Sequence, residues 1–212
     1  MTLVLTCPRC DGPVRPPDLM SSDWRCELHG AVLPFHAPPH ISADVLEAVR
    51  QQAGVPIWVP MPLLTGWTVT GVGWAGDERT GARATALACA GPSPLGGGAD
   101  LLLVAEEPGI GLGARYAGLA GPDPGAGFAA GLPHAKVAIA GHPTPLWSIP
   151  VDADRCAYVG EAEARWLWAV LWPADAGYLF AEQVQLHDLR VQPLPDLVFG
   201  APSPFLRSTS VG

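Results

Sequence analysis

Three cysteines and one histidine near the N-terminus have the types and spacing of a zinc site. Cys7 and Cys10 form one C-x-x-C pair, and fifteen residues separate this pair from Cys26 and His29. Two such pairs on short turns, joined by a hairpin, are typical of a zinc ribbon, in which four N and S ligands close a tetrahedral structural site. We therefore expect Zn²⁺ at these four residues, with no open position for a reacting water.

The same residues allow other assignments. His36 or His40 could replace His29 as the fourth ligand, and iron could replace zinc. Cys7 and Cys10 could also form a redox pair, but the third cysteine and the histidine would then have no role. The ligand spacing favours the four-ligand zinc site over these alternatives.

A second candidate site lies around the glycine-rich stretch 108–133. After this stretch His134 and Lys136 share one face of an expected strand, because side chains alternate along a strand. With Arg115 and Glu106 they could bind an anion or activate a nucleophile for acyl transfer, phosphoryl transfer or hydrolysis. This enzyme hypothesis requires the four side chains to converge on one cavity.

The stretch 109–113, Gly-Ile-Gly-Leu-Gly, follows an apolar strand and so looks like a dinucleotide-binding turn. Glu106, Glu107 and Pro108 intervene where a phosphate would need a bare turn, and we interpret 109–113 as a close-packed loop. The two adjacent glutamates point to opposite faces of a strand, and we expect them at a solvated strand end.

The elements that position these residues are short, because the chain has 25 glycines and 24 prolines. Three segments are expected: a zinc ribbon at 1–33, a Pro-rich linker at 34–41 and a β-rich domain at 42–212. Gly12 and Gly30, which follow the two ligand pairs, are expected to take positive φ. Ser42 should cap a short helix.

The apolar pattern predicts strands over 67–75, 83–90, 101–105, 136–140, 146–150, 156–161 and 165–172. In the last of these, Trp166, Trp168 and Trp172 should lie on one face. A helical turn is expected near 114–119, and a helix over 174–189. The fold class is therefore α+β: the ribbon followed by a mostly antiparallel sheet of six to eight strands with one or two short helices.

Composition narrows the function classes. The net charge is −8, and residues 1–30 carry three arginines against four acidic residues, so the ribbon lacks the basic surface that nucleic-acid binding needs. No apolar run is long enough for a membrane span, and the N-terminus lacks the basic region of a signal peptide. Cys89 and Cys156 lie in apolar stretches and should be free thiols, which fits a reducing cytoplasm.

Several stretches resemble a conserved family of high-GC bacterial proteins whose function is unknown. The similar stretches are Cys-Pro-Arg-Cys with Cys-Glu-Leu-His-Gly, and those at 75–86, 101–119, 133–136 and 143–147. The resemblance covers nearly the whole chain and implies no activity.

The sequence therefore favours a non-catalytic, cytoplasmic zinc-ribbon protein that binds a protein partner or a small ligand. The absence of a catalytic motif, the closed metal site and the eight tryptophans support this interpretation. An enzyme that uses His134 and Lys136 is the first alternative. Nucleic-acid binding through the ribbon is the second.

Overall fold

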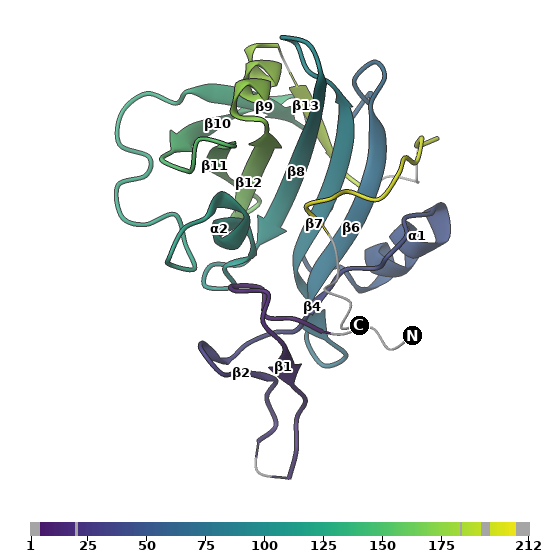
Figure 1. The fold of residues 1–212 in the computed structure, drawn as a ribbon, viewed down its shortest axis with the longest axis vertical. Coiled ribbons are helices and arrows are strands. Elements are labelled where there is room, and N and C mark those ends of the chain that lie inside the picture. The colour runs from purple at the N-terminus through teal and green to yellow at the C-terminus, as the bar shows by residue number, and fades with distance from the viewer. Residues whose placement is uncertain (1–4, 20, 183, 192–195, 207–212) are drawn as a thin grey trace.

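The computed structural model describes residues 5–19, 21–182, 184–191 and 196–206. It has the expected α+β fold, in which a small N-terminal sheet projects from a much larger one (Figure 1). The small sheet is antiparallel and has the order β1 (Val14–Arg15), β2 (Arg25–Cys26) and β3 (Gly30–Ala31). β1 and β2 form the hairpin expected between the two ligand pairs, and β3 follows the second pair.

The large sheet has ten strands in the order β4-β6-β7-β8-β12-β11-β10-β9-β13-β5. All neighbours are antiparallel except β9 and β13, so the expected antiparallel character is confirmed, with more strands than the six to eight predicted. The strands are β4 (Phe35–His36), β5 (Trp58–Pro60), β6 (Thr68–Asp77), β7 (Gly81–Pro92), β8 (Gly98–Glu106), β9 (Ala135–Ile139), β10 (His142–Ile149), β11 (Cys156–Ala162), β12 (Arg165–Trp172) and β13 (Val184–Asp188).

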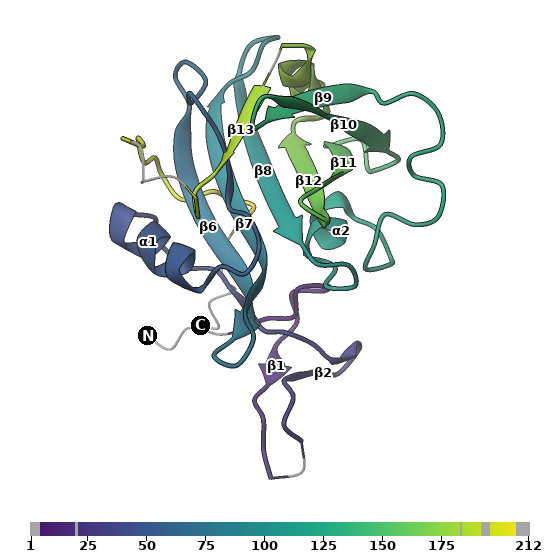
Figure 2. The ribbon, with the colours of Figure 1, turned by 180° about the vertical axis from the view of Figure 1, so that it is seen from behind.

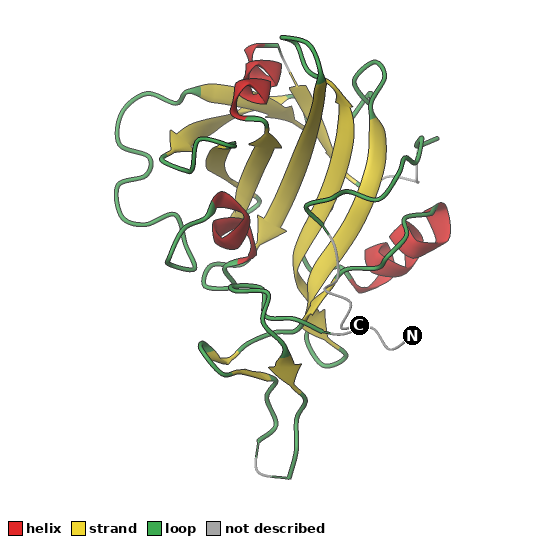
Figure 3. Cartoon of the chain, in the orientation of Figure 1, coloured by secondary structure: helices red, strands yellow, loops and turns green. Residues whose placement is uncertain are grey.

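Among the described residues, three short helices accompany the sheets, against the one or two predicted (Figure 3). They are α1 (Ala43–Gln52), α2 (Leu112–Ala117) and the 3₁₀ helix η1 (Ala174–Ala181). Ser42 caps α1 as expected, because its side chain accepts a hydrogen bond from the Val45 N–H at 3.3 Å. No helix in the described parts of the chain is long and apolar enough to cross a membrane.

The helix predicted over 174–189 is wrong beyond residue 181. Residues Val184–Asp188 form β13, which pairs with β9 on one side and with β5 on the other. Val184, Leu186 and Asp188 are buried while Gln185 is exposed, so burial follows the two-residue period of a strand. Pairing with β9 and β5 therefore determines the conformation of this segment, although its sequence pattern favours a helix.

The large sheet curls, so that β5 lies against β7 and β8. Figure 2, which views the sheet from behind, shows β13 passing across it. Both faces of the central strands are buried as a result. On β12, Leu167, Ala169 and Leu171 face the inner core, while Trp168, Val170 and Trp172 face an outer core beneath α2, as the alternation predicts.

The segment expected to be a linker contributes a strand to the large sheet. Phe35 is 1% exposed, and β4 pairs with β6. Phe35 also exchanges backbone hydrogen bonds with Thr6 in the ribbon, at 2.7 and 3.2 Å. The ribbon is therefore joined to the body by strand pairing, and its position relative to the large sheet is set by these bonds.

Candidate metal centre

The four predicted ligands come together at the base of the ribbon. The ligand atoms of Cys7, Cys10, Cys26 and His29 all lie within 4.8 Å of one another. The Cys10 and Cys26 sulfurs are 3.7 Å apart, and His29 Nδ1 lies 3.5 Å from Cys7 Sγ and 3.6 Å from Cys26 Sγ. These four residues can hold a metal ion.

Three of the six spacings match the edges of a metal-centred tetrahedron, and the other three are within 4.8 Å. With metal–sulfur bonds of about 2.3 Å and metal–nitrogen bonds of about 2.0–2.1 Å, a tetrahedron has S···S edges of about 3.8 Å and S···N edges of about 3.6 Å. The 3.7 Å separation of the Cys10 and Cys26 sulfurs and the two His29 separations agree with these edges. All four tetrahedral positions are then supplied by the protein.

Backbone N–H groups hydrogen-bond two of the cysteine sulfurs, with opposite net effects on the pKa. The Cys7 sulfur accepts hydrogen bonds from the N–H groups of Arg9 and Cys10, but burial dominates and raises its pKa to about 12. Burial also acts to raise the pKa of Cys26, but hydrogen bonds from the N–H groups of Leu28 and His29 lower it to about 7. A bound cation would displace the remaining thiol protons.

The turns after the two ligand pairs use different residue types. Gly30 has φ of 69°, as predicted for the residue after the second pair. After the first pair the left-handed residue is Asp11, with φ of 62°, so the expectation for Gly12 is wrong. The left-handed region favours glycine but also tolerates aspartate, whose short side chain can bond locally.

Neither alternative fourth ligand belongs to the cluster. His36 stacks on Trp74 with ring centroids 4.5 Å apart, and its Nε2 lies 3.0 Å from the Gly76 carbonyl oxygen. His40 is exposed and lies outside the group of four. His29 is therefore the histidine that belongs to the four-residue cluster.

Two arginines connect the first ligand pair to the body. Arg9 lies inside the C-x-x-C turn, and its guanidinium donates to the carbonyl oxygens of Gly109 and Ile110. Arg115, on α2, donates to the Asp11 carboxylate at 2.8 Å and to the Cys7 carbonyl oxygen at 3.4 Å. The glycine-rich segment before α2 and the metal-binding turn therefore hold each other in place.

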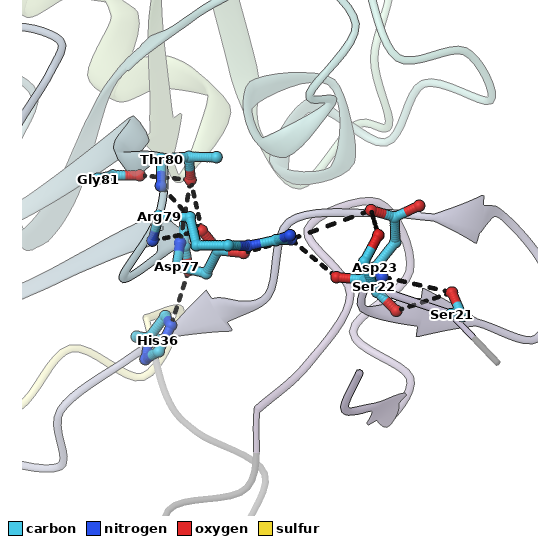
Figure 4. Close-up of polar contacts among 9 residues, drawn as sticks. Ser21, Ser22, Asp23, His36, Asp77, Arg79, Thr80 and Gly81 are labelled. Atoms are coloured by element: carbon cyan, nitrogen blue, oxygen red, sulfur yellow. Dashed lines mark hydrogen bonds and ion pairs between the residues drawn. The ribbon is translucent and has the colours of Figure 1, made fainter. Parts of the chain in front are cut away.

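A third arginine spans the gap between the β6–β7 turn and the ribbon hairpin. Figure 4 shows Arg79 reaching from the turn toward Ser22 and Asp23. Its Nη2 donates to the Ser22 carbonyl oxygen at 2.8 Å and lies 3.3 Å from the Asp77 carboxylate. Two cavities share Arg79, Asp77 and Trp24 in their walls, one of about 250 Å³ and a mostly apolar one of about 590 Å³.

The four residues of the enzyme hypothesis do not converge. His134 and Lys136 are exposed at the start of β9 and line one cavity of about 410 Å³. Arg115 lies at the ribbon, and Glu106 is fully buried beside α2. Of five cavities formed by the described residues, two include His134 and none includes Arg115 or Glu106.

The carboxyl group of Glu106 lies at the start of α2, where a bound phosphate would lie, so the expected solvated position is wrong for this residue. Its carboxylate accepts the Leu112 N–H at 2.7 Å and the Gly113 N–H at 3.1 Å. Glu107 points the other way and pairs with Arg83 at 2.6 Å. The chain's own carboxylate thus fills the phosphate position of the turn-like sequence, which agrees with a close-packed loop.

Burial raises the pKa of Glu106 to about 8, and the Leu112 and Gly113 N–H groups only partly oppose this. The neighbouring Asp123 carboxylate also raises it. Between about pH 4.5 and 8 the folded chain therefore binds a proton that the unfolded chain has lost, so this residue's contribution to stability falls as the pH rises. In wild type this proton should make the unfolding free energy decrease with rising pH by up to about 1.4 kcal/mol per pH unit. We expect this decrease to be absent in Glu106→Gln.

Denaturant titrations at several pH values between 5 and 8 measure that slope. Glu107→Gln is the matched control, because Glu107 is adjacent but surface-paired with Arg83 and Arg165. Identical pH slopes in wild type and Glu106→Gln would contradict the raised pKa.

The sequence interpretation missed the residues that orient the ribbon. Arg9, Asp11 and Arg79 carry no motif, and their body or ribbon partners lie 57 to 104 positions away in the chain. Asp123 was missed as well; it accepts the Gly109 N–H and the Trp166 indole N–H, each at 2.8 Å. The one available signal was the position of Arg9 inside the C-x-x-C turn, next to two of the four cluster residues.

Comparison with known families gives one match. A family model described as a family of unknown function, DUF6758, matches residues 1–206, so the chain belongs to that family. No curated protein and no solved structure matches the chain.

Proposed function

We propose that this DUF6758 protein is a non-catalytic binding module in which a structural Zn²⁺ holds the ribbon in a fixed position against the body. The observation that carries the proposal is the tetrahedral spacing of the Cys7, Cys10, Cys26 and His29 ligand atoms. In this proposal residues 1–33 are the zinc ribbon and the large sheet is the platform that supports it.

The ligand set supports zinc over iron. Three cysteines and one histidine are a usual set for structural zinc, whereas iron–sulfur clusters are mostly held by four thiolates. Four protein ligands leave no position for a water, which supports a structural metal over a catalytic one. Five free cysteines among the described residues support a reducing compartment such as the cytoplasm.

The contacts around the metal support a binding role. Arg9 and Arg115 connect the metal-binding turn to the glycine-rich segment and α2, and Arg79 connects the ribbon hairpin to the β6–β7 turn. A metal that fixes the ribbon would therefore also fix the walls of the two cavities between ribbon and body. A protein partner or a small ligand is the proposed occupant of this region.

Metal analysis tests the proposal. Protein purified without chelator should contain about one zinc per chain and little iron, by mass spectrometry of the metals. Less than about 0.5 zinc per chain, or iron in its place, would contradict the zinc ribbon.

A further inference from the structure

A cavity of about 250 Å³ lies between the ribbon and the body, outside the set of metal ligands. We call it the joint cavity. Its walls include Arg9 of the first ligand turn, Ala31 and Leu33 at the end of the ribbon, and Ile110 of the glycine-rich segment. It is smaller than the roughly 300–1,000 Å³ of most small-molecule sites.

The ribbon presents a free strand edge to this cavity. β3 is the last strand of the small sheet, and β2 is its only strand neighbour in the described part of the chain. The Val32 N–H bonds the Trp24 carbonyl oxygen at 3.0 Å, and bonding direction alternates along an antiparallel pair. The N–H and C=O groups of Ala31 and Leu33 therefore point away from β2, toward the side on which a strand could be added.

The cavity also contains a cation without an ion-pair partner. The Arg9 guanidinium donates to the Gly109 and Ile110 carbonyl oxygens, and no carboxylate of the described residues forms an ion pair with it. Arg79, in the same wall, pairs with Asp77 at 3.3 Å and lies 4.0 Å from Asp23, which also lines the cavity. The two arginines and two aspartates of the lining cancel in formal charge, but both aspartates lie beside Arg79. Arg9 is therefore the lining cation that has no carboxylate partner among the described residues.

The groove beside β3 ends against the body. Past Leu33 the chain enters the large sheet, because the Pro34 carbonyl oxygen accepts the Gly76 N–H at 3.0 Å and Phe35 pairs with Ala75. Phe35 also exchanges backbone hydrogen bonds with Thr6, so the strand position beside Phe35 is already occupied. A peptide laid along β3 therefore has room for only a few residues before it must end.

We propose that the joint cavity binds the C-terminal residues of an extended peptide from a protein partner. The peptide backbone pairs with the free edge of β3, and its terminal carboxylate binds Arg9. This inference rests on the proposed function, because the zinc ribbon supplies both the strand edge and Arg9.

The probe is a pool of acetylated pentapeptides with three randomised C-terminal residues, prepared with a free C-terminal acid and, separately, with a C-terminal amide. Titration of the zinc-loaded full chain is followed by ¹H–¹⁵N NMR. The acid pool should shift the amide signals of Ala31, Leu33 and Ile110, and the amide pool should bind about tenfold more weakly, since a charge-assisted pair is lost.

Two variants locate the site. Arg9→Gln should weaken binding of the acid pool about tenfold, while Arg25→Gln, at an exposed arginine of β2 outside the cavity, should not. Ala31→Pro removes one outward N–H at an exposed edge position and should also weaken binding. If Arg9→Gln loosens the ribbon, the Ala31→Pro variant still tests the peptide site, because it leaves Arg9 unchanged.

Equal binding of acid and amide pools, shifts confined to other surfaces, or no binding up to about 5 mM would each overturn the inference. Zinc content is measured on the same samples. Peptide binding that fails in protein with a full zinc content refutes only the peptide site, whereas protein without zinc refutes the proposed function itself.

Discussion

Replacing Cys26 with serine should abolish stoichiometric zinc binding and unfold the ribbon, while the large sheet stays folded. The ribbon buries few side chains, so metal binding must supply much of its folding free energy. Structural zinc sites in small peptides contribute about 10–16 kcal/mol at neutral pH, and a Cys26→Ser variant loses most of that contribution. Metal analysis and limited proteolysis between residues 12 and 25 measure the two effects.

The control for this variant is Cys156→Ser. Cys156 is a half-buried thiol of β11, far from the ligand cluster in the sequence and outside it in the structure. This variant should keep its zinc and its resistance to proteolysis in the ribbon. About one zinc per chain in Cys26→Ser protein would show that the four residues do not form the metal site.

Replacing Trp168 with alanine should destabilise the body by about 3–5 kcal/mol, as expected for a fully buried tryptophan. Trp168 is 0% exposed and lies on the central strand β12, where its ring fills the outer core. A Cβ at Gly113 would lie 2.3 Å from this ring, so α2 rests directly on the indole. Denaturant unfolding measures the loss of stability.

The same substitution should also loosen the ribbon. Arg115 of α2 donates hydrogen bonds to the Cys7 carbonyl oxygen and the Asp11 carboxylate. A displaced α2 would break these bonds, which hold the turn between Cys7 and Asp11 in place. Faster zinc loss to a chelator under native conditions measures this second effect. Trp147→Ala is the control, since Trp147 is partly exposed, donates to the Gly131 carbonyl oxygen and contacts the Phe128 ring. Equal stability of the Trp168→Ala and Trp147→Ala proteins would contradict the packing argument.

The sheet faces were predictable because they depend on a local pattern. Alternation along β12 placed Trp168 and Trp172 on one face and Leu167 and Leu171 on the other, and the two buried cores follow this division. The helix predicted over 174–189 was wrong at Val184–Asp188, because this segment pairs with β9 and β5 as a strand despite its helical pattern. Local periodicity does not reveal partners that lie more than 45 residues away.

Which of the two adjacent glutamates, Glu106 or Glu107, would be buried was the least predictable property of the site. Glu106 and Glu107 are adjacent, yet Glu106 is fully buried under α2 and Glu107 pairs with Arg83 at the surface. Alternation separates the two side chains but does not say which face will be covered. That choice depends on where α2 and the loop behind it pack, which involves residues from several strands.

The amino-acid sequence alone determined the cluster of four residues that could hold a metal, because they sit on two tight turns whose geometry is local and whose residue types suit one tetrahedral cation. Only the tertiary structure decided what surrounds the cluster. Arg9, Arg79 and Arg115 find partners 57 to 104 positions away, and no local pattern encodes such pairs. These long-range contacts orient the ribbon, leave the edge of β3 open and create the joint cavity.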